Sequence, residues 1–207
     1  MVGQILDRLR ATGELAEPRR RTISARKRSW RRPHAVRKPA GWPTERPGDL
    51  VQVDTLDIRP VPGAALKQFT ARDVVSRWDV LELRSTASAR SAVAILDALA
   101  ARMPFPLRAL SVDNGSEFMA EFEVTCAERG IALLTLPPRS PKLNGAVERA
   151  NRTHTEEFYE ITDAEPDLAT LQVALLDSET TYNTVRPHQA LGYLTRAEYL
   201  ASLGIDV

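Results

Sequence analysis

The sequence has one cysteine, Cys126, among its 207 residues. A single thiol excludes an internal disulfide framework and a zinc site built from several thiolates. It is typical of a protein kept in a reducing compartment, so we expect a cytoplasmic setting. No apolar run approaches the roughly 20 residues that span a bilayer, and the N-terminus lacks the apolar core of a signal peptide. We therefore expect no membrane partner.

The net charge of +1 conceals an uneven distribution. Residues 1–46 hold 13 Lys or Arg and 4 Asp or Glu, a net charge of +9, so the remainder carries −8. A basic segment joined to an acidic body indicates a polyanionic partner, although charge alone fits a solvated, disordered run equally well. We interpret residues 18–46 as a basic arm and linker, preceded at 4–16 by a short amphipathic helix.

Hydrophobic periodicity beyond residue 47 predicts a mixed α/β domain. Apolar alternation and apolar runs predict strands at 50–58, 67–75, 78–83, 107–112 and 131–136. Helical spacing and capping residues predict helices at 89–103, at 116–130, at 144–159, from 167, and from Thr195, which has capping-box spacing to Glu198. Short links between the first three strands favour an antiparallel meander. The order of elements predicts a five-stranded mixed sheet flanked by helices.

Three acidic residues occupy unusual positions in this pattern. Asp54 lies in the middle of the first strand, Asp113 ends the fourth strand, and Glu148 lies one turn into a helix that follows a proline-rich loop. Each has an ordinary explanation: a charge on an edge strand, a turn former before Asn-Gly, and an acid favoured in the first turn of a helix. Asp113 and Glu148 are 35 positions apart.

The segments around these acids, residues 51–55, 111–118 and 141–149, resemble the three acidic motifs of DDE transposases and retroviral-type integrases. The tail at 182–192 resembles a C-terminal motif common in bacterial insertion-sequence transposases, and the whole resemblance covers about residues 47–200 in order. It implies a ribonuclease H-like fold in which the first strand is central and the fourth is its parallel neighbour. Asp54 and Asp113 would then face one cleft, with Glu148 brought across from them by its helix.

The resemblance also implies metal-dependent DNA strand cleavage and strand transfer during DNA integration. Two Mg²⁺ or Mn²⁺ ions roughly 3.5–4 Å apart can clamp the attacking and leaving oxygens of a phosphodiester, and such hard ions select carboxylate oxygens. Asp54 would bridge the two ions, while Asp113 and Glu148 would each complete one. The implied partners are DNA, both element ends and target, and further copies of the chain in a dimer or larger assembly. The implied location is the bacterial cytoplasm, at the nucleoid.

Candidate DNA contacts lie beside Glu148 and in the arm. They are Lys142, Asn144, Arg149 and Arg152 near the acid, and Arg26, Lys27, Arg28, Arg31 and Arg32 in the arm. Arg152 has the alternative role of an i,i+4 salt bridge with Glu148, and Asn144 that of a helix cap. We interpret Glu117 as an acid that starts a helix and His154 as a surface-helix residue.

Two features depart from the insertion-sequence pattern. Such transposases commonly have proline where Arg196 stands, a change expected to affect only the start of the last helix. They also normally carry helix-turn-helix domains that recognise the element's terminal repeats, whereas fewer than 50 residues precede the core here. We therefore interpret residues 1–17 as a remnant of such a domain, 47–165 as the catalytic core and 166–207 as its helical tail. The alternatives are a truncated, non-transposing DNA-binding remnant and a hydrolytic nuclease of the same fold.

Overall fold

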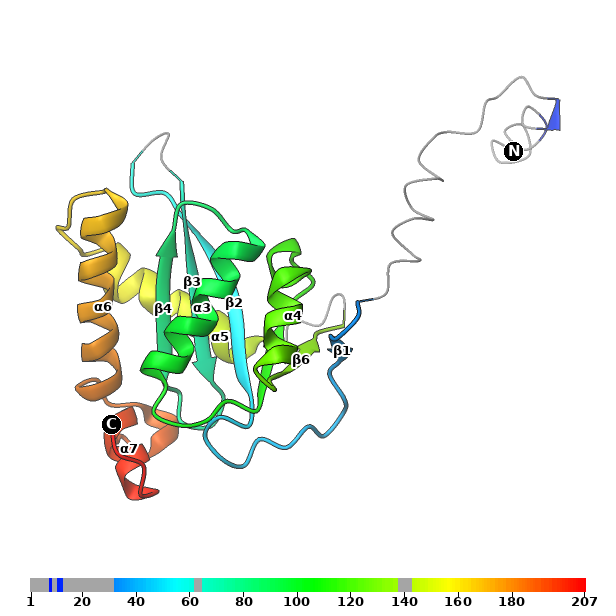
Figure 1. The fold of residues 1–207 in the computed structure, drawn as a ribbon. Helices are drawn as coiled ribbons and strands as arrows, with labels where there is room; N and C mark the ends of the chain where they lie inside the picture. The colour runs from blue at the N-terminus through cyan, green and yellow to red at the C-terminus, as the bar shows by residue number, and fades with distance from the viewer. Residues whose placement is uncertain (1–7, 9–10, 13–31, 62–64, 138–142) are drawn as a thin grey trace. The chain divides into compact units, whose positions relative to one another are not determined.

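The computed structural model describes residues 8, 11–12, 32–61, 65–137 and 143–207. The chain divides into two compact units, residues 1–33 and 34–207. Most of the first unit, with most of the helix predicted at 4–16 and the arm residues Arg26, Lys27, Arg28 and Arg31, lies outside the described residues. The second unit is an α/β domain built on one mixed sheet (Figure 1).

The described residues form a six-stranded sheet of order β1-β6-β5-β2-β3-β4. The strands are β1 (Val36–Arg37), β2 (Val51–Ile58), β3 (Leu66–Asp73), β4 (Asp79–Arg84), β5 (Ala109–Val112) and β6 (Ala132–Thr135). Strands β2, β3 and β4 form an antiparallel meander, while β5 is parallel to both β2 and β6. The expected central position of the first predicted strand, beside the fourth as its parallel neighbour, is confirmed.

The helices cover both faces of this sheet (Figure 1). They are α3 (Ala89–Arg102), the 3₁₀ turn η1 (Ser116–Phe118), α4 (Glu121–Glu128), α5 (Gly145–His154), the π-helical turn η3 (Thr155–Tyr159), α6 (Leu168–Thr184), the 3₁₀ turn η4 (Gln189–Leu191) and α7 (Arg196–Ser202). Val51 and Val53 belong to the main apolar core, together with residues of α3 and α4. Since side chains alternate along a strand, Gln52 and Asp54 point to the other face, where α5 contacts β2 and β3.

The prediction of five strands is wrong by one, because residues 36–37, within the predicted arm and linker, form a strand. Val36 pairs in parallel with Leu134 of β6, and Lys38 N–H donates to Thr135 O. The Glu123 carboxylate holds the approach to β1 by accepting from His34 N–H at 2.6 Å. Pairing covers the open edge that β6 would otherwise present. A two-residue strand is too short to show any periodicity in the sequence.

Two predicted helix boundaries also change. The helix expected from Ser116 to Gly130 is interrupted at Ala120, whose φ of 51° separates η1 from α4. Helix α6 begins as predicted, with Asp167 as its N-cap, and it runs to Thr184, so it includes the first residues of the tail motif at 182–192. The predicted capping box of Thr195 and Glu198 is present. No helix in the described ranges is both long and apolar enough to cross a membrane.

Candidate active site

Asp54 lies in the middle of β2, on the face that α5 covers, and its side chain is half-buried. It pairs in register with Thr70 of β3. Asn151 of α5 donates from Nδ2 to Asp54 Oδ2 at 3.0 Å, so this carboxylate is tied directly to the helix that carries Glu148. Asn151 follows Glu148 by three positions and therefore lies on the same face of the helix.

Asp113 follows directly after β5, the parallel neighbour of β2. Its Oδ1 accepts from the backbone N–H of Gly115 at 2.7 Å. A Cβ atom at Gly115 would lie 2.9 Å from Asp113 Oδ1 and 2.7 Å from Glu117 Oε2, closer than ordinary contact allows. Glycine at this position therefore lets two carboxylates approach the same stretch of backbone.

Glu117 is in the first turn of η1, as an acid that starts a helix should be, but it is also part of the site. The Thr55 hydroxyl, adjacent to Asp54 in β2, donates to Glu117 Oε1 at 3.1 Å. Sequence reasoning assigned Glu117 a structural role, and its place beside Asp113 and β2 comes from the tertiary structure. Its position four residues after Asp113, just beyond a glycine, is the signal in the sequence.

Glu148 is exposed in the first turn of α5, and the N-terminus of this helix is held by β2. Gln52 Oε1 accepts from the N–H groups of Ala146 and Val147, both at 3.1 Å, and Gln52 Nε2 donates to Leu143 O at 2.8 Å. Gln52 precedes Asp54 by two residues on the same strand face. One strand therefore supplies both the central acid of the site and the anchor of the helix bearing Glu148.

The position predicted for Asn144 at the start of α5 is confirmed, but its side chain does not cap the helix. Asn144 occupies the N-cap position, but within the described part of the chain its side chain makes no capping hydrogen bond. Gln52 instead accepts hydrogen bonds from the N–H groups of the first turn of α5. The side chain of Asn144 is buried, since the residue is only 7 % exposed. A buried side chain has little surface to offer to DNA.

Electrostatics link the acids of the site. The pKa of Asp54 is raised to about 6, mainly by burial and further by the negative charges of Asp113, Glu148 and Glu117. Asp113, Glu148 and Glu117 therefore each lie within electrostatic reach of Asp54. No three His, Cys, Asp or Glu side chains among the described residues, however, stand in an arrangement that could hold a metal ion. The acids offer only carboxylate oxygens, a donor set that suits Mg²⁺ or Mn²⁺.

The candidate DNA contacts are only partly within the described residues. Lys142 and four of the five candidate residues in the arm fall outside them, while Arg32 is described and half-buried. Arg149 and Arg152 are exposed on α5. Arg152 does form an i,i+4 salt bridge, but with Glu156, Nε to Oε1 at 2.7 Å, and not with Glu148.

Two interpretations of single residues are overturned by burial. His154, interpreted as a surface residue, is 1 % exposed, with Nε2 2.8 Å from Asp79 Oδ2. Arg196, expected to matter only for the start of the last helix, is fully buried and donates to the carbonyl oxygens of Tyr182 and Arg186. Both side chains point into the protein and have polar partners there, although Arg196 Nη2 has no hydrogen-bond partner among the described residues.

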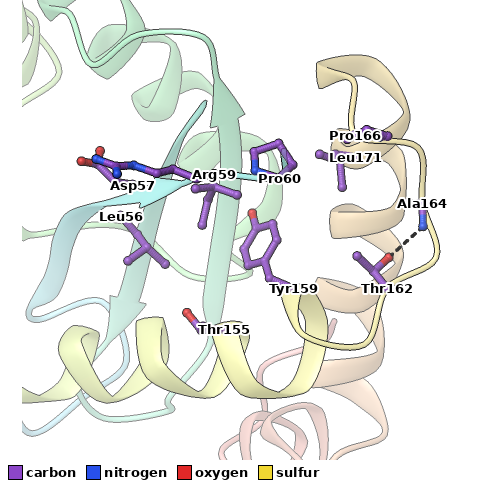
Figure 2. A pocket seen from close by; sticks show the side chains of 11 residues that line it. Leu56, Asp57, Arg59, Pro60, Thr155, Tyr159, Thr162, Ala164, Pro166 and Leu171 are labelled. Atoms are coloured by element: carbon purple, nitrogen blue, oxygen red, sulfur yellow. Dashed lines mark hydrogen bonds between the residues drawn. The ribbon is translucent and has the colours of Figure 1, made fainter. Parts of the chain in front are cut away.

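Two cavities flank the sheet face that carries Asp54, and none of the three predicted acids lines either. A cavity of about 340 Å³ lies beyond the end of β2, between η3 and the start of α6 (Figure 2). Tyr159 points into it, and its hydroxyl donates to Gln68 Oε1 at 2.6 Å. A second cavity of about 580 Å³ is lined by Arg37, Lys38 and Trp42 among others.

Comparison with known families identifies the domain. Two family models, both described as "Integrase core domain", match residues 44–141 and 129–195, which together span most of the second unit. The mixed sheet with its flanking helices is ribonuclease H-like, the fold of retroviral integrase cores. The chain belongs to the integrase core family, the class of integrase and transposase catalytic cores.

Solved structures agree with this assignment. The catalytic core domain of BIV integrase is 27 % identical, with a TM-score of 0.58 over 75 % of this chain and 95 % of that one. The HTLV-2 integrase catalytic core domain in complex with magnesium, in a trimeric form, is 17 % identical, with a TM-score of 0.56 over 74 % of this chain and 96 % of that one.

A third similar structure is the simian T-cell lymphotropic virus intasome in complex with PP2A regulatory subunit B56 gamma. Its chain is 19 % identical, with a TM-score of 0.59 over 80 % of the present chain. The present chain spans 57 % of that chain's length. A comparison with curated proteins found no match.

Proposed function

We propose that this chain is the catalytic core of a DDE transposase or integrase that performs metal-dependent DNA strand cleavage and strand transfer at Asp54, Asp113 and Glu148. The observation that carries the proposal is the convergence of charge on Asp54. The pKa of its carboxyl is raised to about 6 by burial and by Asp113, Glu117 and Glu148, which come from two separate segments, the stretch from the end of β5 into η1 and helix α5. Perturbed carboxyls gathered on one face of a fold are typical of a catalytic site.

Asp54, Asp113 and Glu148 would hold two divalent cations, which supply charge stabilisation at the attacking and leaving oxygens of the phosphate. Binding a cation would draw the three carboxylates closer than they now stand, because it removes their mutual repulsion. Asn151 orients Asp54 through its hydrogen bond, and Gln52 places the first turn of α5. A magnesium complex of the HTLV-2 core domain supports this choice of cation.

The substrates would be DNA ends and a DNA target, held by several copies of the chain on nucleoid DNA in the bacterial cytoplasm. Two similar proteins favour assembly: the HTLV-2 core is described in trimeric and dimeric forms, and the simian virus chain belongs to an intasome. The exposed Arg149 and Arg152 are the proposed phosphate contacts on α5. The arm residues and Lys142 remain proposed contacts from the sequence.

The test compares Asp113→Asn with Asp57→Asn. Asp57 is an exposed acid on β2, three residues from Asp54, and it pairs with Lys67 outside the site. Each purified protein is incubated with supercoiled plasmid and labelled duplex ends in Mg²⁺ or Mn²⁺. We expect wild type and Asp57→Asn to nick or join DNA, and Asp113→Asn to be inactive while keeping the wild-type unfolding temperature.

Activity that survives Asp113→Asn, or that is unchanged by chelation of divalent ions, would overturn the proposal. The products decide between the two reactions of this fold. Joined DNA identifies strand transfer, whereas nicked plasmid and shortened ends without joined products identify the hydrolytic nuclease.

A further inference from the structure

Helix α5 carries Glu148, yet apolar packing does little to define its position. Its buried residues are Val147, Ala150, Asn151, Thr153 and His154. A helix is normally placed by a broad stripe of large apolar side chains. Here Val147 is the sole buried residue of the helix that is both apolar and larger than alanine. The location of α5 must therefore depend on directional polar contacts.

Asp79 connects to both ends of α5 although it lies in β4. Arg72 of β3 donates to Asp79 from Nε and Nη2, each at 2.6 Å, and from Nη1 to the carbonyl of Ala146 in the first turn of α5, at 3.3 Å. His154, the last residue of α5, places Nε2 2.8 Å from the same carboxylate. Glu148 lies between these two attachments.

Residues of the C-terminal tail contact Arg72 and Asp79. The hydroxyl of Tyr182 accepts from Arg72 Nη2 at 2.6 Å. Asn183 pairs with the backbone of Asp79 in both directions, accepting from its N–H at 3.0 Å and donating to its carbonyl at 2.8 Å. Arg196 stacks on Tyr182, with its guanidinium carbon 3.7 Å from the ring centre. The first two residues of the tail motif at 182–192 thus form hydrogen bonds with Arg72 and Asp79.

Burial makes these contacts directional and strong. Asp79 is fully buried, which by itself raises the pKa of its carboxyl, but Arg72 and His154 lower that pKa below its ordinary range. The carboxylate is therefore charged, and its two partners satisfy it through charge-assisted hydrogen bonds. Satisfied polar networks in a low-dielectric interior define one arrangement of the elements that they join.

We propose that Tyr182 and Asn183 are positioning residues that, through Arg72, Asp79 and His154, set the place of α5 and hence of Glu148 relative to Asp54. The inference rests on the proposed function, since it gives the tail motif a task in that reaction. None of these five side chains belongs to the acid triad. Their effect reaches the acids through the backbone of α5 and through Asn151.

The test uses Tyr182→Phe, which keeps the ring and removes the hydroxyl that accepts from Arg72. His154→Leu removes the hydrogen bond between the end of α5 and Asp79, and His154→Gln retains a polar group at that position. The matched control is Glu179→Ala, three residues before Tyr182 on α6. Buried Glu179 accepts from Leu81 N–H at 2.5 Å and from Arg102 at 2.8 Å, and it has no hydrogen bond to α5 in the described structure. The substitution therefore removes hydrogen bonds that hold α6 to β4 and α3, and, among the described residues, it removes none that holds α5.

Three measurements separate positioning from stability: Mn²⁺ affinity by titration, hydrogen exchange of the α5 amides, and kcat against KM for DNA. We expect Tyr182→Phe and His154→Leu to speed exchange in α5 and weaken Mn²⁺ binding. They should lower kcat roughly 10- to 100-fold with KM unchanged, as displacement by about 1 Å does. His154→Gln should recover part of both losses. Glu179→Ala should lower the unfolding temperature and leave all three unchanged.

The proposal is overturned if Tyr182→Phe and His154→Leu lower only the unfolding temperature, with α5 exchange and Mn²⁺ affinity matching those of Glu179→Ala. Failure of the proposed function gives a different result. If wild type binds Mn²⁺ but neither cuts nor joins DNA, the strand chemistry is wrong. The comparison of exchange and Mn²⁺ affinity between the variants then still decides the positioning role.

Discussion

Replacing Gln52 with leucine should destabilise the domain through the N-terminus of α5. The buried amide of Gln52 accepts from the N–H groups of Ala146 and Val147 and donates to Leu143 O. Leucine has a similar volume, so the change removes these three hydrogen bonds without opening a large cavity. The first turn of a helix has no internal partners for its N–H groups, so both donors lose their acceptor.

The magnitude follows from burial at the two donors. Val147 is fully buried, so its N–H is left unsatisfied at a cost of about 1–3 kcal/mol, whereas half-buried Ala146 can turn to water and loses about 1 kcal/mol. The free energy of unfolding should therefore fall by about 2–4 kcal/mol. Gln52→Glu is the matched variant, because it keeps the acceptor for both N–H groups and places a favourable charge at the helix N-terminus.

Denaturant unfolding checks the stability, and hydrogen exchange at Ala146 and Val147 checks the site of the effect. We expect Gln52→Leu to lose the full amount with rapid exchange at both amides, and Gln52→Glu to lose about 1 kcal/mol or less. Equal losses in the two variants, or protected amides in Gln52→Leu, would refute the idea that Gln52 caps α5.

Two further predictions concern the acids themselves. Asp54→Asn should abolish catalysis but raise stability by roughly 1–3 kcal/mol in metal-free buffer at pH 8, because the folded pKa of about 6 exceeds the unfolded value of 3.8. The folded state then binds the proton more tightly, so stability falls as pH rises from about 4 to about 6 and the advantage of Asn disappears below about pH 4. Unfolding curves of both proteins across this range check the sign, and a greater stability of wild type at pH 8 would contradict it. Gly115→Ala should leave the unfolding temperature nearly unchanged, since the atoms nearest to its Cβ are the ends of the Asp113 and Glu117 side chains, but should weaken Mn²⁺ binding by displacing them. Unchanged Mn²⁺ affinity would place the cation away from Asp113.

The sequence by itself predicted five of the six strands, the place of Asp54 within one of them and that of Asp113 at the end of another. Apolar alternation located β2 with Asp54 in its middle, and the apolar run of β5 located Asp113 at its end. These elements can be predicted from the sequence because the spacing of apolar residues along a strand or helix indicates which of its faces is buried. Helix caps could be predicted as well, because Thr195 and Asp167 accept hydrogen bonds from N–H groups that lie within three residues of them in the sequence.

The tertiary structure decided which polar groups meet across the fold. Gln52 and Ala146 are 94 positions apart, and Asp79 and His154 are 75 apart, so no local pattern pairs them. The polar sequence of its helix predicts a surface position for His154, whereas Asp79 of β4 and the ring of Tyr182 make its burial favourable. The free-energy cost of burying a polar group is offset by a specific hydrogen-bond partner. Which partner is available depends on sheet register and helix packing, and these depend on the whole fold.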